Sequence, residues 1–205
     1  VPKFLPGGAP SGWMNEVTLH GALSRHKYAN IIHIYHYTET VLLKDGIDLG
    51  YAVLFMEEGK ANLRNLLEFL QEKPNNAFRD LLLARVFLGI TSAVASLHDN
   101  AWVHRDLKLE NVFLSDEPRF CFRHPHRCFA KLSDFETACN TNLGTCENTW
   151  APPGTSMYVS PEGFETRVSQ ASDDMWSLGV MLHELVHDGQ YPTGNWIDKM
   201  QKLKH

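Results

Sequence analysis

The pattern of apolar and polar positions predicts strands near the beginning of the chain and helices through most of the remainder. Two stretches rich in Ile, Val and Tyr, residues Ile31 to Val41 and Gly50 to Met56, predict strands. Residues Phe78 to His98 are apolar on nearly every side, which is typical of a buried helix. Further helices are expected over Trp13 to His26, Leu63 to Gln71 and Asp173 to His187. The order predicts a small mixed segment followed by a larger, mainly helical one.

Two segments between the predicted helices have little periodic pattern. Residues Trp102 to Leu132 alternate between short strand-like runs and loops. Residues Thr137 to Pro153 form a long polar loop with Gly and Pro. Long loops inside a compact domain are usually either functional or disordered. Candidate chemistry is therefore expected between the two most apolar helices.

Composition and charge narrow the class of protein. With 205 residues, the chain is long enough for one core and a second small one. A net charge of -5 gives no indication of nucleic-acid binding. The most apolar stretch, Leu81 to Leu97, is interrupted by Arg85 and is short for a bilayer, so no membrane span is expected. No basic-then-apolar leader follows Val1.

The four cysteines form two pairs with the same spacing, Cys121 with Cys128 and Cys139 with Cys146. One reading is four reduced thiols, which would suit the cytoplasm. A second is one or two disulfides in a secreted protein, with a bridge across the first pair. A third is a zinc site in which the two intervening histidines join the first pair, although so tight a spacing leaves little chain to wrap the ion. The localisation stays open between cytoplasmic and secreted.

One segment carries a specific chemical pattern. Residues Val103 to Asn111 read V-H-R-D-L-K-L-E-N, which resembles the catalytic loop H-R-D-L-x-x-x-N of eukaryotic protein kinases. The resemblance implies that Asp106 orients the substrate hydroxyl and accepts its proton. It also implies that Lys108 lies near the transferred phosphoryl group and that Asn111 binds one Mg²⁺.

Three further motifs follow in the order of that family. Residues Ser133 to Glu136 resemble the D-F-G motif, in which Asp134 would bind Mg²⁺. Residues Gly154 to Glu162 are similar to G-T-x-x-Y-x-A-P-E, the end of the activation segment. Residues Asp174 to Val180 are similar to the family's D-x-W-S-x-G-V helix, whose Asp braces the catalytic loop through its backbone. The resemblance covers the chain from about Trp13 onward.

The resemblance also implies a nucleotide site. Glu16 would be the ion-pairing residue of the regulatory helix αC, and Lys3 would be its partner, although Pro2 removes a strand N–H. Met56 would be the gatekeeper, followed by a hinge whose backbone meets adenine. Phe113 would lie beneath the adenine ring. The nucleotide-binding candidates are Lys3, Glu16, Met56, Glu57, Glu58, Gly59 and Phe113.

The chain departs from the family pattern in several places. It contains no Gly-rich G-x-G-x-x-G loop, and Glu136 takes the place of the D-F-G glycine. The family continues through further helices after the position of Pro192, one of which supplies an Arg that pairs with the residue at Glu162. We therefore expect a chain that is truncated at both ends. Residues Ser115 to Ala130 are interpreted as an insertion, a feature of divergent secreted kinases such as the rhoptry kinases of apicomplexan parasites.

The expected fold is α+β, protein-kinase-like and two-lobed. Residues 1–58 would form an incomplete N-lobe of sheet plus helix αC, and residues 59–205 a mainly helical C-lobe without its last helices. The expected activity is transfer of the ATP γ-phosphoryl group, with Mg²⁺ or Mn²⁺, to a protein substrate. Lys108 and Thr155 favour Ser or Thr hydroxyls over Tyr by the resemblance. The alternative is a pseudokinase that binds partners without catalysis, which Glu136 and the missing Gly-rich loop favour.

A regulatory reading concerns Arg105, which precedes Asp106. Kinases with this Arg are often switched when a phosphate on the activation segment pairs with it and orders the loop. Thr149 is the predicted phosphorylation site and Thr145 the second choice, whereas the Thr155 hydroxyl is expected near Asp106. The alternative is an unregulated polar loop whose threonines face water.

Residues His183 to His187 read H-E-L-V-H, which matches the zinc-protease motif H-E-x-x-H. Such a helix would place two imidazoles one turn apart with Glu184 as base. The same residues also continue the helix that begins near Asp174, and no third ligand is evident in the sequence. A metalloprotease is therefore kept only as a distant alternative.

Overall fold

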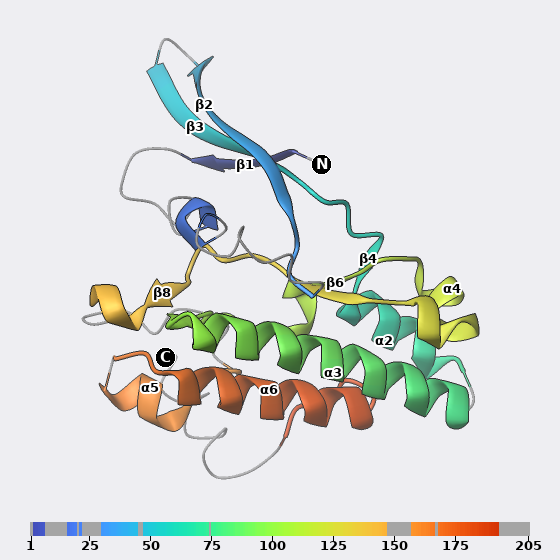
Figure 1. The fold of residues 1–205 in the computed structure, drawn as a ribbon. Helices are drawn as coiled ribbons and strands as arrows, with labels where there is room; N and C mark the ends of the chain where they lie inside the picture. Colours follow the sequence, from blue (N-terminus) through green and yellow to red (C-terminus); the bar gives the residue numbers. More distant parts are fainter. Residues whose placement is uncertain are drawn as a thin grey trace.

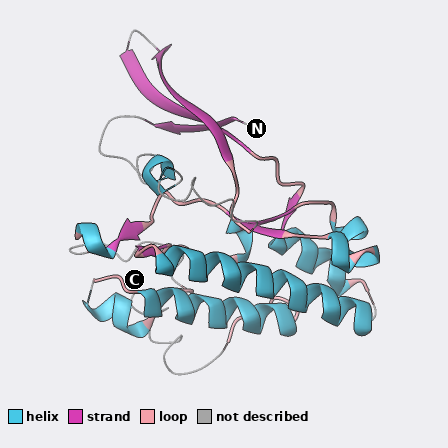
Figure 2. Cartoon of the chain, in the orientation of Figure 1, coloured by secondary structure: helices cyan, strands magenta, loops and turns pink. Residues whose placement is uncertain are grey.

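The protein has a sheet at one end and a layer of helices at the other (Figure 1). The computed structural model describes residues 2–6, 16–19, 21, 30–44, 47–73, 75–146, 157–166 and 168–192. Figure 2 shows the longest strands gathered in the sheet and the two longest helices lying side by side below it. This arrangement confirms the predicted α+β class. The division at residue 58 stays a prediction.

Three antiparallel strands form the sheet: β1 (Pro2–Pro6), β2 (Ile34–Lys44) and β3 (Ile47–Met56), in the order β1-β3-β2. β1 contains Pro2 and Lys3, the candidate partner of Glu16. Pro2 is the first residue of β1, which is an edge strand of the described sheet, and there a missing N–H is tolerated. The backbone of Lys3 lies opposite Leu54 of β3.

The two predicted strands are confirmed with shifted boundaries. β2 begins at Ile34 instead of Ile31, because the connection before it is tied to β7 (Ala130–Leu132). Ile32 N–H donates to the Leu132 carbonyl at 2.8 Å, and Leu132 N–H donates to Asn30 at 2.8 Å. These bonds join the sheet to the helical part of the molecule. The predicted helix over residues 13–26 is described only at residues 16–19 and 21, which are helical.

The helical part contains α2 (Leu63–Gln71), α3 (Ala77–Asp99), α4 (Pro118–Arg123), α5 (Pro161–Thr166) and α6 (Ala171–Val186). The three long helices predicted there are confirmed to within two residues. Local chemistry sets two of their starts, because Asn62 and Asn76 accept backbone N–H groups of the first turns of α2 and α3.

Short strands connect these helices and frame the catalytic region. They are β4 (Ala61–Asn62), β5 (Trp102–Val103), β6 (Val112–Leu114), β7 and β8 (Cys139–Asn140), with the 3-10 turns η1 (Leu109–Asn111), η2 (Pro125–Arg127) and η3 (Thr141–Leu143). β4, β6 and β7 form one small sheet, and β5 pairs with β8.

α3 is the central helix of the core. Leu82, Val86, Ile90 and Leu97 are buried in the main apolar cluster, which also contains Leu178 and Met181 of α6. By length and composition α3 is also the one described helix that could cross a membrane. Its inner face packs on α6 and β7, whereas Phe78, Leu81 and Leu88 on its other side are exposed. The prediction of a buried helix therefore holds for one face only.

The interpreted insertion contains a helix that the sequence analysis did not predict. Residues 118–123 form α4 and residues 125–127 form η2, and both pack against α3. A six-residue helix is too short to show a periodic pattern. A disulfide joins Cys121 of α4 to Cys128. The zinc reading of this segment is therefore wrong, because its two sulfur ligands are bonded to each other.

Candidate active site

The residues of the H-R-D-L-x-x-x-N match converge on one carboxylate. Lys108 Nζ lies 2.6 Å from Asp106 Oδ2. The Asn111 amide donates to the Asp106 backbone carbonyl at 2.9 Å and to Asp106 Oδ2 at 3.1 Å. Asp106 and Asn111 are both buried. The structure therefore brings together three of the four predicted catalytic residues, with a cation and an amide on the proposed base.

A buried aspartate holds the backbone of this loop. Asp174 of α6 accepts N–H groups from His104 at 2.9 Å and from Arg105 at 3.0 Å, and His98 Nε2 lies 2.8 Å from it. Arg105 has a φ of 71°. A left-handed backbone at a residue other than Gly costs about 1–3 kcal/mol and persists only where neighbouring contacts impose it. The two bonds to Asp174 supply that constraint, as the family resemblance implied.

His104 is buried and neutral inside the same loop. Its Nε2 lies 3.1 Å from the Ser133 carbonyl, which can only accept, so Nε2 carries the proton. Its Nδ1 accepts the Asp106 N–H at 3.3 Å. Burial lowers the pKa of His104, more than the nearby Asp174 raises it. The uncharged ring is therefore a structural link between the catalytic loop and the Ser133 segment.

The depressed pKa of His104 predicts an acid-sensitive fold. Below its ordinary pKa of 6.5, the unfolded chain binds a proton at this ring that the folded chain excludes. The free energy of unfolding should therefore fall as the pH falls through 6.5, by up to about 1.4 kcal/mol per pH unit. Urea unfolding between about pH 5 and 7.5 measures this slope. His104→Gln should flatten it, and the exposed control His36→Gln should not; equal slopes in both variants would contradict the assignment.

Two paired short strands bring the residue before Asp134 against Asn111. β6 and β7 pair Val112 with Leu132, and the Ser133 N–H and hydroxyl both donate to the Asn111 carbonyl, at 2.9 and 3.0 Å. Asp134 follows directly, with a φ of 65°. The side-chain N–H of Asn111 donates to Asp106. The side-chain oxygen of Asn111 is therefore the atom that can bind a cation. An amide and a carboxylate oxygen suit Mg²⁺.

The Glu136 substitution does not strain the backbone. Among the described residues other than Gly, positive φ occurs at Ala101, Arg105, Asp134 and Asp188, and Glu136 is not one of them. The loss of the D-F-G glycine therefore carries no conformational cost in this arrangement. Its negative charge remains close to the predicted metal ligand Asp134 along the chain.

Glu16 reaches the same region from the N-terminal side. Glu16 is 1% exposed, and its Oε1 accepts the Phe135 N–H at 3.1 Å. Phe135 is fully buried, with its ring centroid 5.1 Å from that of His104. The predicted ion pair between Glu16 and Lys3 stays a prediction, because the Lys3 side chain lies outside the described residues.

The predicted hinge follows β3 and contacts Phe113. Lys131 Nζ lies 2.6 Å from Glu57, and Glu57 N–H donates to His33 at 2.8 Å. A Cβ at Gly59 would lie 2.5 Å from the Phe113 ring, so only Gly fits there. Met56 packs on the buried Leu54, and Glu58 pairs with Lys60 at the surface. The structure thus joins the hinge to Phe113, and it adds Lys131, which the sequence analysis missed.

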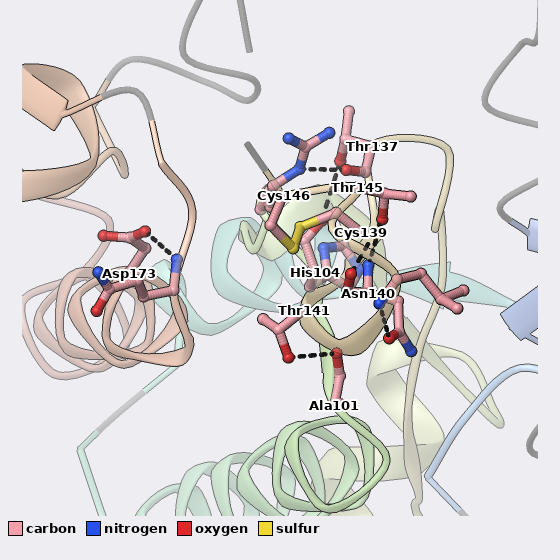
Figure 3. The surroundings of a disulfide bond; sticks show 12 residues. Ala101, His104, Thr137, Cys139, Asn140, Thr141, Thr145, Cys146 and Asp173 are labelled. Carbon is pink, nitrogen blue, oxygen red and sulfur yellow. Dashed lines mark hydrogen bonds between the residues drawn. A yellow bond between two sulfur atoms is a disulfide. The ribbon is translucent and has the colours of Figure 1, made fainter. Parts of the chain in front are cut away.

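The first part of the activation segment is closed by a second disulfide, Cys139 to Cys146 (Figure 3). Within this loop the Thr145 hydroxyl accepts the Asn140 N–H at 2.7 Å and donates to the Asn140 carbonyl at 3.2 Å. Thr145 therefore uses its hydroxyl inside the loop, which makes it a poor phosphorylation site. Thr149 and Thr155 lie outside the described residues, and Glu162 is exposed in the first turn of α5.

Arg105 contacts this segment directly. Its Nε donates to the Thr137 carbonyl, and the Thr137 hydroxyl donates to the His104 carbonyl at 3.0 Å. Its Nη1 is buried and has no hydrogen-bond partner among the described residues. Burial lowers the pKa of Arg105, against the effect of Asp174. Its regulatory role stays a prediction.

Comparison with known proteins agrees with this geometry. Residues 9–203 match the protein kinase domain model. The chain belongs to the protein kinase domain family. Serine/threonine-protein kinase ksp1 of Schizosaccharomyces pombe is 30% identical over 180 residues, which are 85% of this chain and 34% of that protein. Serine/threonine-protein kinase PLK4 of Nematostella vectensis is 30% identical over 175 residues, which are 84% of this chain and 15% of that protein.

A solved structure supports the same fold. The Cydia pomonella granulovirus kinase PK-1 aligns with a TM-score of 0.66 and 22% identity, covering 95% of this kinase chain and 64% of that one. At this identity the likeness concerns the fold alone. The chain spans about a third or less of the length of the two curated relatives, so statements about a whole protein do not transfer to it directly.

The H-E-L-V-H match does not form a metal site. Glu184 is fully buried and accepts from the Tyr158 hydroxyl, whereas His183 and His187 are at the surface. The two imidazoles stack at 4.0 Å, with their Nδ1 atoms on backbone carbonyls. Among the residues that the structure describes, no three His, Cys, Asp or Glu side chains form a group suited to a metal. The geometry contradicts the protease reading, because Glu184 faces away from both histidines.

Proposed function

We propose that this kinase domain transfers the γ-phosphoryl group of ATP to Ser or Thr hydroxyls of a protein substrate. The observation that carries the proposal is the cluster of Asp106, Lys108 and Asn111 around one carboxylate. Phosphoryl transfer requires positioning and charge neutralisation more than covalent chemistry, and this cluster supplies both. The serine/threonine-protein kinases among its relatives support the choice of acceptor.

Each residue has a distinct part in the proposed reaction. Asp106 orients the acceptor hydroxyl and takes its proton, while Lys108 neutralises charge on the transferred group. Asn111 and Asp134 would hold Mg²⁺ or Mn²⁺, which supplies charge neutralisation at the phosphates when bound. The backbone of Glu57 to Gly59 and the ring of Phe113 would hold adenine. Met56 borders the same site at the end of β3.

The first test asks whether the domain binds ATP through a metal ion, which the proposed reaction requires. Thermal unfolding of the purified protein should shift upward only when ATP and Mg²⁺ are both present, because the ion bridges protein and phosphates. Ligand at about 100 times its Kd stabilises the folded state by about 2.7 kcal/mol. Asp134→Asn should remove the dependence on Mg²⁺, while the exposed Asp99→Asn should leave it intact. A shift that is independent of metal would instead favour the pseudokinase.

Gly59 gives a test of the adenine site. Gly59→Ala places a Cβ 2.5 Å from Phe113, so the ring must move and ATP affinity should fall about tenfold. The matched control is Gly179→Ala in α6, where an added Cβ meets nothing within 4 Å. That control should stabilise the helix by about 0.5–1 kcal/mol and leave ATP affinity unchanged. Titration of Mg²⁺-ATP with both variants decides; unchanged affinity in Gly59→Ala would remove Phe113 from the site.

The cysteines support a location for the protein. All four form disulfides, and no free cysteine remains. Disulfides persist in oxidising compartments and are rare in the cytosol. We therefore favour a secreted or otherwise oxidising location over the cytoplasm.

A further inference from the structure

Arg64 of α2 joins two acidic residues that come from different parts of the chain. Its Nε lies 2.8 Å from Glu110 Oε1 in η1, and its Nη2 lies 2.8 Å from Glu184 Oε2 in α6. The ion pairs of the described residues give neither glutamate another cation. One guanidinium therefore bridges two carboxylates between the catalytic loop and α6.

Glu184, the buried glutamate of this pair, depends on the positive charge of Arg64. The Glu184 side chain is fully buried, and burial raises its pKa against the opposing effects of Tyr158 and Arg64. The Tyr158 hydroxyl donates to Glu184 Oε1, and Arg64 Nη2 lies 3.3 Å from that hydroxyl. A buried carboxylate without a cation is costly. The two glutamates and the Tyr158 hydroxyl thus form a site that fits the planar guanidinium group of an arginine.

This acceptor lies beside the proposed phosphoryl-transfer site. Glu110 precedes Asn111, whose amide binds Asp106. Tyr158 belongs to the segment that matches the end of the activation segment. The Arg64 and Glu110 side chains are 23% and 42% exposed, so the acidic pair is open to solvent on one side. A basic side chain of a bound protein could reach the same two carboxylates.

We propose that Arg64 is a specificity-determining residue, because its guanidinium fills a cation site of Glu110 and Glu184 that a basic substrate side chain would otherwise occupy. The inference rests on the proposed kinase function. Because Arg64 already occupies this site, a basic residue near the acceptor hydroxyl of a substrate should not improve its binding. Removing Arg64 should expose a site for guanidinium groups and create a preference that the natural protein lacks.

The first experiment measures the cation site without any catalysis. Arg64→Ala should be stabilised against heat by millimolar ethylguanidinium, whereas the unaltered protein should not. Ethylurea, which has a similar shape without the charge, should have no effect. The double variant Arg64→Ala/Glu184→Gln should lose the response, because it lacks the buried carboxylate. If Arg64→Ala folds only with ethylguanidinium present, the proposal is supported; folding that ethylurea promotes equally would overturn it.

The second experiment measures specificity with two acceptor peptides that differ only in Arg or norleucine near the Ser. The unaltered kinase should phosphorylate both at similar kcat/KM. Arg64→Ala should prefer the Arg peptide by at least about tenfold, and Arg64→Lys should not. Equal use of both peptides by Arg64→Ala, together with no ethylguanidinium response, refutes the proposal. An ethylguanidinium response in a protein that phosphorylates neither peptide would leave the cation site standing and count against the proposed function.

Discussion

Replacing Asp106 by Asn is expected to lower the rate of phosphotransfer by about 10²–10⁴-fold, the usual contribution of a positioned acid or base. The amide keeps the shape of the side chain but cannot accept the hydroxyl proton. ATP affinity should be nearly unchanged, because Asp106 faces Lys108 and Asn111 and is not a predicted nucleotide or metal ligand. Initial rates of transfer from labelled ATP to a Ser-containing peptide measure the effect.

The control for this variant is Asp99→Asn, which removes an exposed carboxylate at the end of α3. It should retain full activity. Mg²⁺-ATP titrations on both variants check that binding is intact. If Asp106→Asn phosphorylates the peptide as fast as the parent protein, the assignment of the base is wrong, whatever the contacts of its side chain.

Removal of the Cys139–Cys146 disulfide is expected to have the second large effect. This bridge and Cys121–Cys128 have the same sequence separation of 7, so they form a matched pair. Closing a loop of this length stabilises a protein by about 2.5 kcal/mol in the chain-entropy model. Both paired Cys→Ser variants should therefore unfold at similarly lower urea concentrations.

Only the activation-segment bridge should also affect activity. The Cys146 carbonyl accepts the Ser169 N–H at 3.0 Å, and β8 pairs with β5 immediately before the catalytic loop. Cys139→Ser/Cys146→Ser should speed hydrogen exchange over residues 139–146 and reduce phosphotransfer. Cys121→Ser/Cys128→Ser should do neither, because that bridge closes the insertion around α4. Equal losses of activity in the two variants would show that the bridges act through global stability alone.

Mass mapping of non-reduced peptides from the native source should precede these measurements. Linked peptides that contain Cys139 and Cys146 would establish the bridge in the cell. Free thiols in all four cysteines would contradict both the pairing and the oxidising location.

The contact among Asp106, Lys108 and Asn111 could be predicted because these residues are close together along the chain. Asp106, Lys108 and Asn111 lie within one short loop, so a motif match fixes their neighbourhood. The long helices could also be predicted, because a helix such as α3 appears in the sequence as a long run of mainly apolar residues. In the same way, Asp174 could be assigned to the backbone of the catalytic loop from the family pattern.

Other features depend on which way a side chain points or on contacts between residues far apart in the sequence. Local sequence patterns predict neither. The H-E-L-V-H match fixes which residues share a helix, but only tertiary packing turns Glu184 inward to Tyr158 and Arg64. No sequence motif predicts the contacts of Arg64, because its partner Glu110 is 46 residues away along the chain and Glu184 is farther still. The sequence alone also does not show where the D-F-G segment needs a positive φ, which falls on Asp134 and not on Glu136.

The link between Asp174 and the catalytic loop has a consequence for the order of folding. The two bonds that hold His104 and Arg105 span 70 and 69 residues of chain. During synthesis the loop therefore leaves the ribosome well before its brace exists, and contacts of such separation form late. Until α6 docks, the two backbone bonds from Asp174 to the loop are missing. We therefore expect the loop around Asp106 to reach its final geometry late in the folding of the domain.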